Sequence, residues 1–376
     1  MIELIHKNKQ TIMTGDEIQN EDLGYDAFFE SAREKLQLDT LSVARVIAEH
    51  KGLYRVKNLT GEFLAKVTGK KMFTATSRED YPAVGDWVAI QVVDKENAVI
   101  HTILPRKTIL KRKYNNKNET QLIATNIDVA FIVESVDRDF SLNRFERYIA
   151  IAGDGGVQTT IILNKTDLLG DEELASKIAQ IHERFPNVTV LVTSTVTNNG
   201  LEELATYIEK GKTYSFLGSS GVGKSSLINT LLGENALETG AISFQSGRGK
   251  HITTSREIYF LKNGGIVVDN PGMREVGVTD AHTGVDTLFD EIVTLAEKCK
   301  YPDCTHTHEP GCAVAPHVQA GKINPEKFSN FMTLKKEADF YELSELEKRN
   351  RDKKFGRFLK KAKNDLKRSG HKNYSE

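Results

Sequence analysis

The sequence predicts a multi-domain fold with a small N-terminal β-barrel, a central α/β domain built on a parallel sheet, and a C-terminal α-helical domain. A chain of 376 residues is long enough for two to three domains. Short strand patterns follow one another closely near the N-terminus, buried strands alternate with helices in the middle, and no strand pattern occurs beyond about residue 285. The expected boundaries are an acidic extension at 1–40, the barrel at 41–108, the α/β domain at 109–284 and the helical domain at 285–376.

A helical pattern at 25–36 precedes the predicted barrel. Turn signals such as Thr60-Gly61 and Gly69-Lys70 separate its strands. Five short strands spaced this closely favour a closed barrel of OB type, or another small β-module, over an open sheet. The predicted strands are 42–48, 53–57, 63–67, 86–92 and 98–103.

The pattern changes from residue 126 onward to strand, loop and helix. Nearly continuous apolar strands that alternate with helices indicate a parallel sheet covered on both faces. The predicted strands are 129–133, 160–163, 188–192, 214–217 and 266–268.

Composition excludes a protein that crosses a membrane. Hydrophobic residues make up 39% of the chain and charged residues 27%, and no stretch approaches the roughly 18 consecutive apolar residues of a membrane span. The first twenty residues lack the apolar block of a secretory signal. We therefore expect a cytoplasmic protein, and because no segment resembles a dimerisation helix, we expect a monomer.

The net charge of −1 conceals an acidic head and a basic tail. Residues 1–40 contain 4 Lys and Arg against 9 Asp and Glu, whereas residues 348–372 contain 12 against 2. A second basic run, 106–117, has six cations and no acid. Two basic runs in a near-neutral chain indicate a polyanion partner, and the mixed basic and aromatic residues at 353–361 suit an RNA backbone.

Residues 218–225 match the phosphate-binding pattern G-x-x-x-x-G-K-[ST], between a predicted strand and the predicted helix 226–232. In this motif backbone N–H groups surround the phosphates, the lysine contacts the β and γ oxygens, and the hydroxyl coordinates Mg²⁺. The expected nucleotide-binding residues are Gly218, Ser219, Ser220, Gly221, Val222, Gly223, Lys224, Ser225 and Ser226, with Lys224 also expected to act in catalysis.

Asp269 follows the predicted strand 266–268, some fifty residues after the phosphate loop. A carboxylate at this place is typical of the aspartate that holds the metal in P-loop enzymes. We expect Asp269 to bind Mg²⁺ and to act in catalysis, and Gly272 to lie beside the nucleotide.

The tetrapeptide Asn164-Lys165-Thr166-Asp167 matches N-K-x-D, which reads guanine in GTPases. The Asp167 carboxylate would accept from guanine N1 and N2, a donor pair that adenine lacks, so the site would reject adenine strongly. Asn164 and Lys165 are expected to contribute to this loop. Ser194, after the predicted strand 188–192, is a further candidate for contact with the base.

The order of these motifs is unusual for a GTPase. The guanine-reading loop comes first, the phosphate loop second and Asp269 last, whereas ordinary GTPases begin with the phosphate loop. The sequence therefore predicts a circularly permuted P-loop GTPase domain. Permutation also places the segment after Asp269 next to the C-terminal domain, which would let the nucleotide state reach that domain through the connecting chain.

The three cysteines lie within fourteen residues and share their segment with histidines. The spacing Cys299-x4-Cys304-x-His306-x5-Cys312 offers three thiolates and an imidazole, a set suited to structural zinc with no open position. His308 lies close enough in sequence to take the place of His306.

The motif order, between a β-module and a Cys/His cluster, resembles the ribosome small-subunit-dependent GTPase A family (RsgA, also called YjeQ or YloQ). Residues 247–254 look like the switch I of that family and 269–275 look like its D-T-P-G-[MF]-R-E motif, with Asn270 in place of threonine. The resemblance implies GTP and GDP binding, Mg²⁺, one Zn²⁺ and His306 as the imidazole ligand. It also implies a GTPase that binds the small (30S) ribosomal subunit and its 16S rRNA late in assembly, is stimulated by the subunit, and leaves after hydrolysis.

The two switch segments leave some roles open. Either Thr253 or Thr254 would bind magnesium. Met273 stands where many GTPases hold a glutamine that orients water, which predicts slow intrinsic hydrolysis and activation by a partner. His251 is the candidate for the missing polar group, and contact with RNA phosphate or solvent is the alternative.

Two other functions are alternatives to a timer, that is, a GTPase whose hydrolysis sets when it leaves the ribosomal subunit. One is a nucleotide-gated RNA clamp in which hydrolysis is incidental. The other is a permuted GTPase of the large subunit, which the combination of barrel and Cys/His cluster disfavours.

Overall fold

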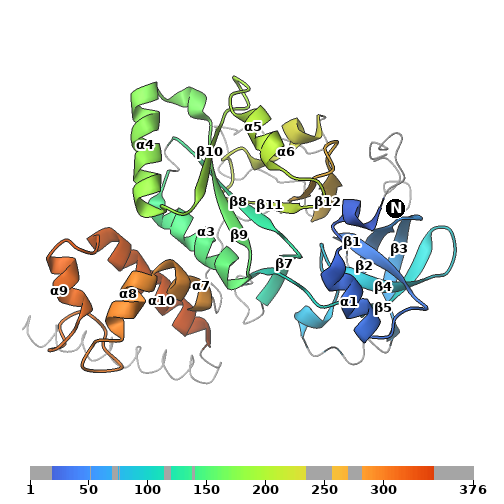
Figure 1. The fold of residues 1–376 in the computed structure, drawn as a ribbon, viewed down its shortest axis with the longest axis horizontal. Helices are drawn as coiled ribbons and strands as arrows, with labels where there is room; N and C mark the ends of the chain where they lie inside the picture. The colour runs from blue at the N-terminus through green and yellow to red at the C-terminus, as the bar shows by residue number, and fades with distance from the viewer. Residues whose placement is uncertain are drawn as a thin grey trace, which may run out of the picture. The chain divides into compact units, whose positions relative to one another are not determined.

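The computed structural model describes residues 19–50, 52–69, 75, 77–113, 120–137, 140–233, 256–269 and 282–342. These residues form two compact units, shown in Figure 1. One unit contains the described residues up to 111 and from 121 to 269, and the other contains 112, 113, 120 and 282–342. Within the described part of the chain, no helix is both long enough and apolar enough to cross a bilayer.

The N-terminal strands close into a barrel, as predicted. The strand order is β1-β2-β3-β5-β4, and pairing between β1 and β4 joins the two ends. Alternate side chains point inward and bury a core that includes Val46, Phe63 and Ile100. The strands are β1 (Ser42–His50), β2 (Leu53–Asn58), β3 (Gly61–Val67), β4 (Trp87–Val92) and β5 (Asn97–Ile103).

A short N-terminal segment packs on the outside of this barrel. It consists of the 3-10 helix η1 (Asn20–Leu23) and helix α1 (Ala27–Lys35), which begins where the Asp26 side chain accepts from the Phe28 N–H. The segment buries Leu23, Tyr25 and Phe29 against Trp87 of β4. The helix predicted at 25–36 is therefore confirmed, and its apolar side chains explain why it is held on the barrel.

The central domain is a sheet whose order is β10-β9-β8-β11-β13-β12. The predicted strands are confirmed, and they pair with one another in parallel. The difference from prediction is β12, which is antiparallel to β13 and also pairs with β1 at Ala48↔Glu257. The barrel and the central sheet therefore share one continuous ladder of strands. The strands are β8 (Val129–Ser135), β9 (Gln158–Asn164), β10 (Thr189–Thr193), β11 (Thr213–Leu217), β12 (Glu257–Phe260) and β13 (Ile266–Asp269).

Helices cover both faces of the central sheet (Figure 1). Helices α3 (Leu142–Asp154) and α4 (Asp171–Arg184) join through the contact of Phe145 with Phe185 and the ion pair of Glu146 with Arg184 at 2.6 Å. Helices α5 (Leu201–Tyr207) and α6 (Lys224–Leu232) bury their apolar side chains in one core with β8 and β11. This arrangement leaves the carboxyl ends of the parallel strands together at one edge.

A two-stranded sheet of β6 (Ile109–Lys113) and β7 (Thr120–Thr125) connects barrel and central domain, and it was not predicted. Part of the basic run at 106–117 is used inside the protein. The Arg106 guanidinium donates to the buried carboxylate of Asp86 at 2.8 and 2.7 Å, and to two backbone carbonyls. Arg106 is therefore a structural residue, whereas 114–117 lie outside the described residues.

The second unit is helical, as predicted. Its described residues from 282 to 342 contain no strand, and Phe289 packs on Phe331 with ring centroids 5.3 Å apart. The basic tail at 348–372 and residues 1–18 of the acidic head lie outside the described residues. The helices are α7 (His282–Leu288), α8 (Asp290–Ala296), α9 (Val314–Gln319) and α10 (Pro325–Glu342).

Candidate nucleotide site and candidate metal cluster

The phosphate loop lies between β11 and α6, where the sequence predicts it. Gly218 and Gly223 have φ values of 145° and 100°, which side-chain-bearing residues rarely adopt. A Cβ at Gly218 would lie 2.2 Å from the Val133 carbonyl oxygen, and one at Gly223 would lie 2.3 Å from Asn164 Nδ2. The two glycines thus allow the loop to pass close to β8 and to the guanine-reading loop.

Lys224 begins α6 and points back into the loop. Its Nζ donates to the carbonyl oxygens of Gly218 and Ser219, both at 2.7 Å. Desolvation lowers the pKa of Lys224 to about 8, and the negative charge of Asp269 acts in the opposite direction. A phosphate group placed here would restore the charge that burial disfavours.

The other residues of the loop differ in exposure. Ser220 and Gly221 are exposed, Ser219 is half-buried and Val222 is buried. Ser225 and Ser226 are half-buried in the first turn of α6, next to Lys224. Hydroxyls and N–H groups at a helix N-terminus suit an anion and its metal.

Asp269 ends β13 and is 6% exposed. Strand β13 runs parallel to β11, with Ser215 paired to Val268, so Asp269 lies at the same edge as the phosphate loop. This is the edge at which ligands bind in open α/β sheets. Gly272 and Met273 lie outside the described residues, as do His251, Thr253 and Thr254.

The guanine-reading loop follows β9, the next strand but one from β11. Asp167 lies in the 3-10 helix η3 (Thr166–Leu168), and the Ser194 hydroxyl, just after β10, donates to its carboxylate. Ser194 Oγ also accepts from the backbone N–H groups of Val196 and Thr197, both at 3.2 Å. Ser194 is therefore placed to orient the Asp167 carboxylate.

Asn164 is 1% exposed, and its side-chain amide makes one hydrogen bond through each of its polar atoms. Its Nδ2 donates to the Val222 carbonyl at 2.8 Å, and its Oδ1 accepts from Thr193 Oγ1 at 3.0 Å. The side chain thus connects the phosphate loop to the base-reading strands. The role of Asn164 in guanine selection stays a prediction, and these contacts also make its side chain a brace between the two loops.

Sequence reasoning missed Asp137. Lys165 has the left-handed φ of 62°, and its Nζ lies 3.7 Å from Asp137 Oδ2. The Ser135 hydroxyl donates to the other carboxylate oxygen at 2.7 Å. The available signal was the position of Asp137 just beyond a predicted parallel strand, where site residues gather.

The four residues of the Cys/His spacing are brought together in the second unit. The ligand atoms of Cys299, Cys304, His306 and Cys312 lie within 4.8 Å of one another. His306 Nδ1 is 3.6 Å from Sγ of both Cys299 and Cys312, whereas His308 is exposed. Three thiols and one imidazole in a closed group form a donor set that fits a tetrahedral metal ion.

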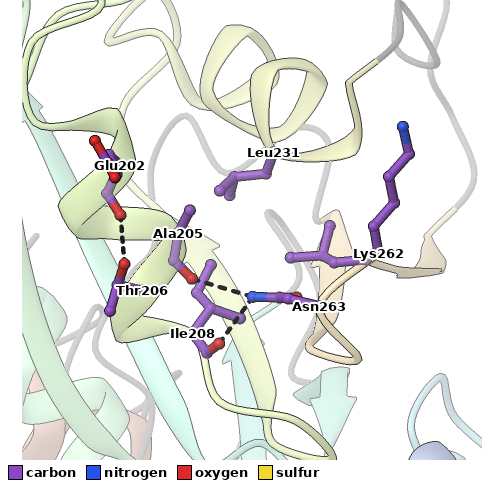
Figure 2. A pocket seen from close by; sticks show the side chains of 8 residues that line it. Glu202, Ala205, Thr206, Ile208, Leu231, Lys262 and Asn263 are labelled. Atoms are coloured by element: carbon purple, nitrogen blue, oxygen red, sulfur yellow. Dashed lines mark hydrogen bonds between the residues drawn. The ribbon is translucent and has the colours of Figure 1, made fainter.

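A hollow of about 500 Å³ lies away from these residues (Figure 2). Helix α5, the end of α6 and the turn between β12 and β13 line it. Asn263 Nδ2 in that turn donates to the carbonyl oxygens of Ala205 and Ile208 at 3.1 and 3.0 Å. The turn is at the opposite end of β13 from Asp269, and none of the candidate site residues lines the hollow.

Comparisons with known proteins agree with these observations. A family model described as RsgA GTPase matches residues 103–279. The small ribosomal subunit biogenesis GTPase RsgA 2 of Lactiplantibacillus plantarum is 40% identical over 316 residues, which cover 84% of this chain and 89% of the relative. The small ribosomal subunit biogenesis GTPase RsgA of Opitutus terrae is 38% identical over 329 residues, covering 84% and 88%.

Two solved structures share the fold. The crystal structure of YjeQ from Thermotoga maritima has a TM-score of 0.58 and 27% identity, and the match covers 79% of this chain and 98% of that one. YloQ, described as a circularly permuted GTPase, has a TM-score of 0.56 and 21% identity, with coverage of 81% and 97%.

Proposed function

Because the chain belongs to the RsgA GTPase family and is a GTP hydrolase, we propose that it acts in the late assembly of the small (30S) ribosomal subunit. The subunit stimulates hydrolysis, and hydrolysis releases the protein. The observation that carries this proposal is that the phosphate loop, Asp269 and the guanine-reading loop of this chain meet at one edge of the sheet. The similarity to small ribosomal subunit biogenesis GTPases supports the choice of partner.

Phosphate binding falls to Lys224 and to the backbone N–H groups of the loop 218–225. Lys224 already lies inside the loop, and its ammonium is oriented by two carbonyls, so little reorganisation is needed when phosphate arrives. Mg²⁺ is held by Ser225, Asp269 and a threonine of switch I, Thr253 or Thr254. When bound, the ion neutralises charge on the β and γ phosphates.

His251 orients the water that attacks GTP, because Met273 cannot make a strong hydrogen bond to it. A timer requires slow hydrolysis in the free protein, and the absence of a glutamine at position 273 supports that behaviour. Contact of the His251 loop with the subunit then completes the site.

Asn164 and Asp167 select guanine, and Ser194 orients the Asp167 carboxylate. In an Asp167→Asn variant the amide presents a donor where guanine also presents donors, so the affinity for GTP should fall at least tenfold. Xanthosine triphosphate has an oxygen at C2 that can accept from this amide, so its affinity should rise. Competition binding with both nucleotides measures this, and the exposed Asp171→Asn provides a matched control. Unchanged preference for GTP in Asp167→Asn would contradict the assignment.

The Cys/His cluster holds one Zn²⁺ through Cys299, Cys304, His306 and Cys312. Four protein ligands leave no position for a substrate, so the ion is structural and ties α8 to α9. The working division of the chain is the extension 1–40, the barrel 41–108, the permuted GTPase domain 109–284 and the zinc-binding domain with its basic tail, 285–376.

The partner is the small subunit with its 16S rRNA, which places the protein in the cytoplasm, where it works as a monomer. The basic tail at 348–372 supplies charge for the RNA backbone, and this contact predicts binding that weakens steeply with salt.

Phosphate release from GTP and from ATP, each with and without purified small subunits, tests the proposal. Strong stimulation of GTP hydrolysis alone is expected. Tight GTP-dependent subunit binding without stimulation would favour the clamp, and stimulation by large subunits in a parallel reaction would favour the other class of permuted GTPase.

A further inference from the structure

The loop between Cys304 and Cys312 is wrapped around one carboxylate, that of Glu309. Its Oε1 accepts from the Thr305 backbone N–H at 3.0 Å and from the Thr305 hydroxyl. Its Oε2 accepts from the backbone N–H groups of Thr307 and His308 at 3.1 and 3.2 Å. Both oxygens are therefore used to hold the backbone on the two sides of His306.

His306 needs such support because its backbone is in the left-handed region, with φ of 58°. Residues with a Cβ are sterically disfavoured there, and a ligand cannot stay in that conformation unless its surroundings impose it. The imposed conformation directs the imidazole inward, where His306 is 8% exposed and its Nδ1 is equidistant from Cys299 and Cys312.

Glu309 is not itself one of the ligands. The group of donors within 4.8 Å of one another comprises the three cysteines and His306, and the Glu309 oxygens are already occupied by the loop. Its Oε2 lies 3.9 Å from Cys304 Sγ, so the carboxylate also borders a second ligand. A carboxylate is ionised at neutral pH and accepts several N–H groups strongly, which an amide cannot do with both of its atoms.

We propose that Glu309 is the positioning residue of the metal site, whose carboxylate holds His306 in its left-handed, inward-facing conformation. This inference rests on the proposed zinc site. A loop shaped before the ion arrives loses less conformational freedom on binding. Removal of the carboxylate should therefore release the His306 imidazole from the ion and weaken the site, although Glu309 is not itself a ligand.

The test compares Zn²⁺ affinity of full-length Glu309→Gln, Glu309→Asp and the native chain, by competition with a chromophoric chelator. Gln keeps the size of the side chain but replaces one acceptor oxygen with a donor that opposes the loop N–H groups. We expect a 10- to 100-fold loss of affinity in Glu309→Gln, as for other residues that orient metal ligands. Glu326→Gln, an exposed site in the same unit, makes the same charge change and should stay within about twofold of native.

The absorption spectrum of bound Co²⁺ supplies a readout that a general loss of stability does not change. Loss of the imidazole alters the d–d bands, whereas a weakened but intact set of ligands keeps them. Altered bands in Glu309→Gln and native-like bands in Glu309→Asp, which keeps both oxygens, would support the proposal.

Native affinity in Glu309→Gln would overturn it, as would a native Co²⁺ spectrum in that variant or equal losses in the Gln and Asp variants. A native chain that binds neither Zn²⁺ nor Co²⁺ would overturn the zinc site itself, and this result is distinct from the other two.

Discussion

Arg45 is the buried cation on which three segments of the first unit converge. It lies in β1 and is 1% exposed, yet its guanidinium donates to the Leu23 carbonyl at 2.6 Å and to Thr213 Oγ1 at 2.8 Å. A longer bond of 3.4 Å reaches the Asn126 carbonyl. These contacts join the N-terminal segment, the barrel and the start of β11, so Arg45→Met should loosen all three together.

The magnitude follows from the two short bonds. Hydrogen bonds from a charged donor contribute roughly 1.5–3 kcal/mol each, and the carbonyl of Leu23 would be left buried without its partner. Desolvation lowers the pKa of Arg45 to about 10, so replacing the cation with methionine also relieves part of that burial penalty. We expect the free energy of unfolding to fall by about 3 kcal/mol.

The only tryptophan of the chain, Trp87, reports on this region. Its ring is buried and packs edge-on against Tyr25 at 4.7 Å, so its fluorescence follows release of the N-terminal segment and opening of the barrel. With an m-value of about 2 kcal/mol/M in urea, the midpoint of the fluorescence transition should fall by about 1.5 M. Lys95→Met, at an exposed turn, should change it by less than about 0.3 M. A loss below about 1 kcal/mol in Arg45→Met would refute the view that these bonds hold the segments together.

Two further predictions concern the phosphate loop. Burial lowers the pKa of Lys224 to about 8, so the side chain loses the positive charge that binds phosphate as the pH rises above that value. GDP affinity should therefore be constant from pH 6.5 to 7.5 and about tenfold weaker at pH 9. Equal dissociation constants for GDP across this range would contradict the prediction. Gly223→Ala places a Cβ 2.3 Å from Asn164 Nδ2 at a φ of 100°, so the affinity for GDP should fall at least tenfold. Gly170 has open space around it, so Gly170→Ala should bind GDP with native affinity in the same titration.

Periodicity predicted most of the fold because its strands have distinct burial patterns. Buried and half-buried side chains alternate along barrel strands such as β2, whereas every side chain of β8 and β11 is buried. The first type gives an alternating pattern of apolar residues in the sequence, and the second gives a nearly continuous apolar run. Strand β12 has only four residues, and β6 ends in consecutive basic residues. Such short or charged strands form because a partner strand is already in place, which depends on contacts distant in sequence.

Motif spacing predicted which residues gather at the site, but not what each side chain contacts. Asn164 belongs to the expected tetrapeptide, but the spacing does not reveal that its amide also bonds to Val222 and Thr193. Glu309 is one of the unspecified residues between His306 and Cys312 in the Cys/His spacing, although it shapes the loop that presents His306. Hydrogen-bond partners and a left-handed φ are properties of the folded chain, so residue types and their spacing do not specify them.

The place of β11 in the sheet also affects the order in which the domain can be built during translation. Strand β8 is complete at residue 135, but its neighbour β11 begins only at residue 213, and β13 ends at residue 269. At roughly 5–20 residues per second, the interval between β8 and β11 lasts on the order of 4–16 s. During this time the edge of β8 that β11 will occupy has no strand to pair with, and unpaired edges invite association with other chains. The nascent protein is therefore most in need of chaperone protection while its central strand is still being synthesised.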